Sequence, residues 1–513
     1  MRIAELFFFM DMGGVERTIA NLANALPAEA FDVSVIVSHH GGMMEKQISP
    51  RVSFVRLDAG SRMPQLIELL RGFDVAHVNT TNENPFFTWA AALSDVPVIV
   101  DTIHAPIDGN PYASYTDRTI CVSRFGASTQ PRPRQTRVIY NAVASTGARP
   151  GITDRVGRPI VMLEMRRPDK EMRFSLLDLA PRFAGRPALQ DVECWILGMD
   201  GVSSGNLRFL GKVADPWSWL ARADFLVHFP AFEALPNGVL EAMGHGAIPV
   251  VAPVGGIPEI VSDAVNGVCR DVASADELLG ALEGLCVSYR TERPRFERLR
   301  QAGYETVRTR FSIEGMRDGY AEIFHALASG KRNGARRGLP RLLGGGAGEG
   351  QEREFLSLLE RYCFERPRAL QTLQEGRLSR FAPLQEAFLS SLLAQEQLKR
   401  GSAEPARVLL DRAVLLIDQD PYLHVLCAQA RWQTGDRAGA SAHFEQALGL
   451  DPDNVWLGME TLQCLLDTGQ VPRARARIGE LLVGVPQDHQ AWRILNGIER
   501  KLAELIDHHG AMQ

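Results

Sequence analysis

The sequence predicts an α/β protein with two doubly wound parallel sheets, followed by an all-α repeat region. Up to residue 330, short apolar runs of strand length alternate with stretches that carry apolar residues at helical spacing. This alternation is typical of parallel sheets covered by helices. After residue 350 the strand-like runs stop, and a helical pattern recurs at a fixed interval. A fixed interval of this kind indicates stacked helical repeats.

The two sheets are expected from the order of the apolar runs. A predicted strand from Ile3 to Met10 is broken by Gly13 and Gly14, and a helical pattern then runs from Val15 to Leu26, where Pro27 ends it. Further strand-like runs of the first unit lie at 33–37, 52–55, 75–78, 96–100 and 120–122. Those of the second unit lie at 160–163, 193–197, 207–210, 223–229 and 249–251.

Length and composition agree with a globular protein of several domains. The chain has 513 residues, of which 45% are hydrophobic and 23% charged. A net charge of −5 gives no reason to expect nucleic acid as a partner, and the seven cysteines include no C-x-x-C pair. The longest apolar runs are too short to span a bilayer. We therefore expect a cytoplasmic protein without disulfides or structural zinc.

The most informative stretch joins a predicted strand to a predicted helix and carries two glutamates, Glu233 and Glu241. The first would lie at the tip of the loop, and the second about two helical turns deeper. Pro236 suits a first helical position. The amides around Ala234 and Leu235 would then form a positive helix end suited to a diphosphate.

The run from residue 232 to 261 resembles the signature of the retaining GT-B glycosyltransferases of family four. In that signature E-G-x-P-x-x-x-x-E-A-M-A is followed by a P-V-V strand and a G-G-x-x-E-I-V turn. The resemblance implies two Rossmann-like domains facing a cleft, with residues 1–145 on the acceptor side and 146–330 on the donor side. It also implies hexosyl transfer from a nucleotide-diphosphate sugar, with retention of configuration and without a metal or a permanently bound cofactor.

By this resemblance, Glu233 would meet sugar hydroxyls near the reacting carbon, and Glu241 would bind the ribose. The amides of Ala234 and Leu235, at the helix start marked by Pro236, would hold the diphosphate. The alternative that the residues alone leave open is a surface helix with two scattered glutamates.

Loops at the carboxyl ends of other strands supply further candidates. Gly13 and Gly14 resemble the family's G-G-x-E-R loop, where the missing side chains let backbone amides approach a ligand. His104 matches the cleft histidine that approaches the transferred sugar. A plain turn and a structural histidine are the alternatives. Asn79 stands where the family has a histidine, which puts one acceptor-side contact in doubt.

The family clamps the donor diphosphate with an arginine and a lysine after the first strand of the second unit. Lys170 aligns with the lysine, whereas Arg166 is one residue out of register and Arg167 is a substitute. Glu164 stands where glycine is common, and a buried carboxylate there would oppose diphosphate binding. Two solvated arginines in a turn are the alternative interpretation.

Beyond residue 330 the chain changes character. Residues 331–350 are rich in glycine and arginine, as in a flexible linker, and their positive charge would also suit weak contact with anionic lipid at the inner face of the membrane. Gly401, Gly435 and Gly469 then recur at 34 residues, which resembles the tetratricopeptide repeat. We expect a helical lead-in at 351–386 and a repeat domain at 387–513, with about three repeats and a capping helix from Gln490 to Leu502.

Two classes of function follow. The favoured one is a retaining glycosyltransferase that acts on a glycan, lipid-linked or protein acceptor, with repeats that recruit the acceptor or a protein partner. The alternative is a repeat-based interaction scaffold whose transferase domain has lost activity. A sugar-nucleotide epimerase fits the cleft but not the paired glutamates.

Overall fold

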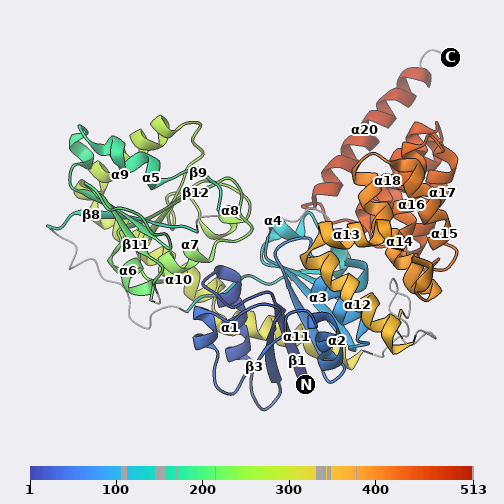
Figure 1. Ribbon diagram of the computed structural model, residues 1–513. Helices are drawn as coiled ribbons and strands as arrows, with labels where there is room; N and C mark the ends of the chain where they lie inside the picture. The colour runs from blue at the N-terminus through green and yellow to red at the C-terminus, as the bar shows by residue number, and fades with distance from the viewer. Residues whose placement is uncertain are drawn as a thin grey trace.

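The computed structural model describes residues 1–105, 113–144, 157–167, 170–213, 215–330, 342–343, 348–376 and 378–510, with side chains up to residue 502. Figure 1 shows two α/β units, blue and green, and an all-helical region in orange and red. The prediction of two parallel-sheet units followed by a helical region is confirmed.

The first unit has a parallel seven-stranded sheet in the order β3-β2-β1-β4-β5-β6-β7. Its strands are β1 (Arg2–Phe7), β2 (Asp32–Val37), β3 (Ser53–Arg56), β4 (Val75–Thr80), β5 (Val98–Ile103), β6 (Arg118–Cys121) and β7 (Thr136–Val138). Strand β1 ends three residues before the predicted Met10. The strand order reverses between β1 and β4, which is where ligands of such sheets bind.

Helices cover both faces of this sheet. They are α1 (Gly14–Ala25), α2 (Arg62–Leu70), α3 (Phe86–Leu93) and α4 (Arg124–Ala127). Helix α11 (Ile313–Ser329), yellow in Figure 1, follows the second unit in sequence but packs against α1. Its buried residues Met316, Tyr320 and Phe324 recur every four residues, so one face of the helix joins the core of the first unit.

The second unit has a sheet in the order β11-β10-β8-β12-β13-β14, and β9 pairs with β12 in antiparallel fashion. Its strands are β8 (Ile160–Met165), β9 (Met172–Phe174), β10 (Val192–Leu197), β11 (Leu207–Gly211), β12 (Phe225–Pro230), β13 (Ile248–Val251) and β14 (Val268–Cys269). Its helices are α5 (Leu176–Leu179), α6 (Trp217–Arg222), α7 (Asn237–Gly244), α8 (Ile257–Ile260), α9 (Ala275–Thr291) and α10 (Arg293–Arg310). The order reverses between β8 and β12, so the loops after these two strands meet at one edge.

The helical region is built from consecutive packed helices. They are α12 (Glu349–Phe364), α13 (Arg366–Glu375), α14 (Pro383–Lys399), α15 (Ala403–Ala413), α16 (Pro421–Gln433), α17 (Arg437–Leu450), α18 (Val455–Asp467), α19 (Val471–Gly484) and α20 (Gln490–Gly510). Gly401, Gly435 and Gly469 follow α14, α16 and α18 with φ of +75°, +87° and +71°. The recurring glycine therefore marks a left-handed residue that ends the first helix of each pair.

The helical region packs directly against the first unit, and the two share one hydrophobic core. Trp89 of α3 stacks on Tyr362 of α12 and meets Phe388 of α14 edge-on. Farther along, the N–H groups of Val455 and Gln490 donate to backbone carbonyls of residues 131 and 128 at 2.8 and 2.9 Å. Of the predicted linker, residues 331–341 and 344–347 lie outside the described residues, as does the basic stretch expected to contact lipid.

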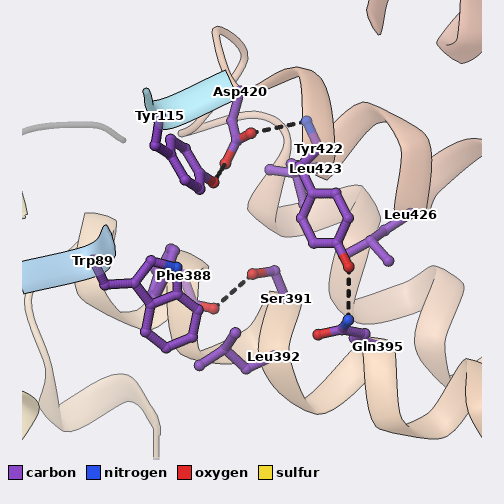
Figure 2. A pocket seen from close by; sticks show the side chains of 10 residues that line it. All are labelled: Trp89, Tyr115, Phe388, Ser391, Leu392, Gln395, Asp420, Tyr422, Leu423 and Leu426. Carbon is purple, nitrogen blue, oxygen red and sulfur yellow. Dashed lines mark hydrogen bonds between the residues drawn. The ribbon is translucent and has the colours of Figure 1, made fainter. Parts of the chain in front are cut away.

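A titratable carboxyl lies in this interface. The Asp420 carboxylate accepts hydrogen bonds from the Tyr115 hydroxyl at 3.2 Å and from the Tyr422 N–H at 2.9 Å (Figure 2). Burial raises the pKa of Asp420 from 3.8 to about 7, against the lowering effect of these hydrogen bonds. The folded protein therefore binds one more proton than the unfolded chain between those pH values.

Because the pKa is raised on folding, the contribution of Asp420 to stability is fully present below about pH 3.8 and is lost progressively as the pH rises to about 7. We expect Asp420→Asn, which imitates the neutral acid, to raise the thermal unfolding midpoint above that of the wild type by more at pH 8 than at pH 5. Scanning calorimetry of both proteins across this range measures the difference. If the unfolding midpoints of the two proteins differ by the same amount at all pH values, the raised pKa of Asp420 is contradicted.

Candidate functional site

The loop after β12 carries Glu233 and is shaped by two glycines from the turn before α8. Gly255 has φ of +58°, and a Cβ there would lie 1.7 Å from the carbonyl oxygen of Glu233. A Cβ on Gly256 would lie 1.9 Å from the carbonyl oxygen of Ala234. Only glycine permits backbones to approach this closely. The G-G-x-x-E-I-V turn thus fixes the position of the Glu233 loop.

Glu233 forms an ion pair with Lys170, and its carboxylate lies 3.3 Å from His228 Nε2. Burial alone would raise the pKa of Glu233, but the hydrogen bond with His228 and the Lys170 ammonium outweigh it and hold the pKa at about 2. Glu233 is therefore ionised at physiological pH. His228 was missing from the sequence prediction, although a lone polar residue in the apolar run of β12 is the signal that marks it.

Two backbone amides lie in the loop just after this carboxylate. Helix α7 begins at Asn237, so the expectation that Pro236 is the first helical residue is wrong by one position. The carbonyl of Pro236 instead accepts hydrogen bonds from the first turn of the helix. No described residue accepts a hydrogen bond from the N–H groups of Ala234 or Leu235. These two donors precede the positive end of α7.

Glu241 lies on α7 and has a different partner from Glu233. Its buried carboxylate is 3.0 Å from Nε of Arg17, which comes from the first turn of α1 in the other unit. The Arg17 guanidinium also lies over the ring of Trp217 on α6. Burial raises the pKa of Glu241, and Arg17 opposes this effect. The two glutamates of the motif thus belong to two separate clusters.

Gly13 and Gly14 allow a close approach between the two units. Asn237 at the start of α7 donates from Nδ2 to the carbonyl of Gly14 at 2.7 Å and to Thr18 Oγ1 at 3.1 Å. A Cβ on Gly14 would lie 3.2 Å from that nitrogen, and one on Gly13 would lie 2.2 Å from the carboxylate of Glu16. The glycine pair therefore brings the start of α1 against the start of α7.

Glu16, from the same loop, is buried in the first turn of α1. Burial raises its pKa to about 7, while its own backbone N–H and the charge of Arg167 lower it. The exposed Arg167 of the second unit thus acts electrostatically on a carboxyl of the first. Glu16 was not selected from the sequence, because a glutamate in the first helical turn is common for its favourable interaction with the helix dipole.

His104 follows β5, as predicted, and is partly buried. Its Nε2 lies 2.9 Å from Oδ1 of Asn79 at the end of β4. Burial, together with the charge of nearby His77, lowers the pKa of His104 to about 3. The imidazole is therefore neutral at physiological pH.

Arg166 does not join the Glu233 cluster. It donates to Ser175 Oγ at 2.8 Å and lies 3.7 Å from Glu164. The fully buried Glu164 carboxylate also accepts hydrogen bonds from the Ser175 hydroxyl and from the N–H of Leu176. Glu164 thus has partners that compensate its burial, and it binds the start of α5 together with Arg166. Of the two predicted clamp residues, only Lys170 reaches Glu233.

In the described part of the chain, no three His, Cys, Asp or Glu side chains are arranged to hold a metal ion. None of the described helices combines the length and apolar character needed to cross a membrane.

Three family models match separate parts of the chain. Residues 12–145 match the model of Glycosyltransferase Family 4, residues 160–287 match Glycosyl transferases group 1, and residues 431–497 match the tetratricopeptide repeat. Among curated proteins, the chain is 26% identical over 360 residues to LpsE of Rhizobium meliloti, a lipopolysaccharide core biosynthesis glycosyltransferase. This alignment covers 63% of the chain and 98% of LpsE.

Solved structures agree in fold. HepE of Anabaena, solved with UDP and glucose, has a TM-score of 0.50 at 17% identity, covering 64% of this chain and all of HepE. A glycosyltransferase of Rickettsia africae has a TM-score of 0.51 at 16% identity, covering 64% of this chain and 98% of its own. Two parallel-sheet units that face a cleft form the GT-B fold. This chain therefore carries a Glycosyltransferase Family 4 domain and a Glycosyl transferases group 1 domain, and it continues into tetratricopeptide repeats.

Proposed function

We propose that this chain is a retaining, metal-independent hexosyltransferase that moves a sugar from a nucleotide-diphosphate sugar to an acceptor hydroxyl. The arrangement around Glu233 carries the proposal, because an ionised carboxylate lies beside a lysine and two backbone amides that donate to none of the described residues. A carboxylate accepts hydrogen bonds from sugar hydroxyls, whereas amides and ammonium groups bind a diphosphate. HepE, solved with UDP-glucose, supports a UDP-sugar as donor.

The proposed mechanism is mainly electrostatic. Lys170 and the amides of Ala234 and Leu235 stabilise the negative charge that develops on the departing diphosphate. Glu233 binds hydroxyls of the sugar and favours positive charge near the reacting carbon. The leaving phosphate oxygen accepts the proton of the acceptor hydroxyl on the same face, which retains the anomeric configuration.

We assign the second cation of the clamp to Arg167 rather than to Arg166. Arg166 is already bound by Glu164 and Ser175, and withdrawing it would leave a buried carboxylate poorly compensated. Arg167 is exposed at the end of β8, and its charge already acts on Glu16 across the cleft. The backbone of Gly13 and Gly14 would form part of the same diphosphate site.

We propose Glu241 as the ribose ligand, held ionised by Arg17. Without Arg17, burial would favour the protonated acid and weaken its binding to two ribose hydroxyls. We expect Arg17→Met to raise the Kd for the donor nucleotide about tenfold at pH 7, which is about 1.4 kcal/mol, and less at higher pH. Isothermal titration with UDP measures this effect.

Arg222→Met is the matched control. Arg222 is on the same helix as Trp217, and its guanidinium likewise lies over tryptophan rings, those of Trp195 and Trp219. This variant should bind nucleotide as the wild type does. Equal affinities of the Arg17 and Arg222 variants would contradict the proposed role of Arg17.

The acceptor and the partner are proposed from chemistry and resemblance. LpsE acts in lipopolysaccharide core biosynthesis, which favours a lipid-linked glycan as acceptor over a protein. The helical region borders the first unit, so we propose that it extends the acceptor side and recruits a protein partner there. A cytoplasmic location, with weak contact at the inner face of the membrane, suits this substrate class.

The test of the function is a panel of UDP-, GDP- and ADP-sugars, assayed for hydrolysis and transfer with and without EDTA. We expect turnover with at least one donor, unchanged by EDTA, and a product of unchanged anomeric configuration by NMR. Arg166 binds Ser175 and does not join the Glu233 cluster. This favours a second candidate, an interaction scaffold with an inactive transferase. Absence of turnover, together with absence of thermal stabilisation by any nucleotide sugar, would support the scaffold.

A further inference from the structure

A line of buried polar side chains runs from the cleft into the core of the first unit. Asn79 on β4 donates from Nδ2 to Glu5 Oε2 on β1 at 3.2 Å. The same Glu5 oxygen lies 2.7 Å from Nδ1 of His77. His77 Nε2 lies 2.7 Å from Thr102 Oγ1 on β5, which in turn lies 3.1 Å from the Tyr320 hydroxyl on α11.

Strand register explains why these residues meet. Glu5 pairs with His77 across β1 and β4, and Asn79 pairs with Thr102 across β4 and β5. His77 and Asn79 are two residues apart, so they share one face of the sheet. Helix α11 covers this face, because the rings of Tyr320 and Phe324 pack on His77. His104 meets the line at its cleft end, through Asn79.

The surroundings of Asn79 determine which way its amide points. Besides Glu5, its Nδ2 lies 3.4 Å from the backbone carbonyl of Leu6, a group that only accepts hydrogen bonds. The NH₂ group must therefore face β1, which turns Oδ1 toward His104. An amide oxygen also only accepts, so the hydrogen in the contact with His104 belongs to the imidazole Nε2.

The other ring nitrogen of His104 is left as an acceptor. A neutral imidazole that carries its hydrogen on Nε2 has a lone pair on Nδ1. Among the described residues, Nδ1 of His104 is buried and has no hydrogen-bond partner. A buried acceptor without a partner costs free energy, so a ligand group that donates a hydrogen bond there is favoured.

We propose that Asn79 is a positioning residue that holds His104 in the Nε2–H tautomer, so that Nδ1 accepts a hydrogen bond from a hydroxyl of the transferred sugar. The part that concerns the sugar rests on the proposed function. A histidine at position 79 could donate as well as accept and would leave both His104 tautomers open. Asparagine leaves only one. The exchange of histidine for asparagine thus fixes the proton position on His104 instead of removing an acceptor-side contact.

The first test is spectroscopic and independent of sugar transfer. Protein labelled with ¹⁵N only in its 12 histidines gives separate ¹⁵N shifts for the two ring nitrogens, and a His104→Gln variant assigns the residue. We expect wild-type His104 to show a protonated Nε2 and an unprotonated Nδ1. In Asn79→Ala both nitrogens should move toward averaged shifts.

Asn82 lies in the loop that follows β4, and its Oδ1 accepts a hydrogen bond from the N–H of Asn84 in the same loop. Asn82→Ala should therefore leave the His104 shifts unchanged. A single, unaltered tautomer in Asn79→Ala would overturn the positioning role, whether or not the protein transfers sugar.

The second test concerns the sugar. We expect Asn79→Ala to lower kcat/KM for the donor sugar about tenfold while the Kd for UDP, which has no sugar, stays the same. This pattern separates the role of Asn79 from general loss of structure, which would weaken both. An unchanged kcat/KM in a variant whose His104 tautomer is lost would overturn the sugar contact alone. A wild type that turns over no donor would instead contradict the proposed function, while leaving the tautomer result intact.

Discussion

Glu233→Gln is expected to lower kcat for sugar transfer at least about 100-fold, a loss comparable to removing one well-placed group that stabilises transition-state charge. Glutamine keeps the size of the side chain and removes its charge. Lys170 and His228 then lose the carboxylate that joins them. Because the pKa of Glu233 is about 2, the charge is present throughout the working pH range, so the loss should be the same from pH 6 to pH 9.

Stopped assays of transfer at saturating donor measure this effect. Glu171→Gln is the matched control, since this neighbouring carboxylate is exposed and should be dispensable. A Glu233 variant that keeps a third or more of the wild-type kcat would contradict the central assignment of the site.

Lys170→Met tests whether Lys170 and Glu233 act together. If Glu233 and Lys170 act as one unit, the double variant should be little slower than the slower single variant, because each substitution already disables the other residue. If the effects of the two substitutions on kcat multiply in the double variant, the lysine binds the diphosphate independently of the glutamate.

Local patterns in the sequence were sufficient to predict most of the fold. Buried parallel strands appear as continuous apolar runs, and β12 leads into the Glu233 loop as expected. The repeat interval was readable because a left-handed residue recurs at Gly401, Gly435 and Gly469, and glycine adopts that conformation without a steric penalty. Boundaries were less certain, as the early end of β1 and the later start of α7 show.

Contacts between elements could not be read in the same way. Nothing near Glu241 in sequence indicates that Arg17 meets it, because that contact depends on how the two units face each other. Arg166 carries the right charge at nearly the right place, but Glu164 and Ser175 hold it elsewhere. Asn79 resembled a lost contact until its register with Thr102 and its hydrogen bond to Glu5 were known.

The position of the helical region was not predicted from the sequence. Trp89 and Tyr115 of the first unit line one pocket with Phe388 and Leu423 of the helical region (Figure 2). Deleting the repeats would expose this apolar surface to water, at a cost of about 25 cal/mol per Å². The role of the repeats is therefore better tested by substitutions in the interface than by truncation.

Asp451→Asn is expected to be the most damaging single change in that interface. Arg132 donates to Asp451 at 2.8 and 3.0 Å, and both side chains are almost fully buried. Neutralising the aspartate leaves a buried guanidinium without a counter-charge, which costs about 3–5 kcal/mol. The loss should appear as faster hydrogen exchange of the Val455 N–H, which donates to Pro131 across the interface.

The adjacent pair between Arg134 and Asp453 is the internal control. It joins the same two segments, but the Arg134 side chain is 60% exposed and that of Asp453 is 30% exposed. Solvent screens such a pair, so Asp453→Asn should cost less than about 1 kcal/mol. If burial is the reason for the difference, Arg132→Met combined with Asp451→Leu should restore most of the protection, because apolar residues replace a buried ion pair at little cost. Equal exchange rates in the two single variants would show that the interface does not depend on the buried pair. If the double variant exchanges as fast as Asp451→Asn, the loss comes from the geometry of the pair and not from its unpaired charge.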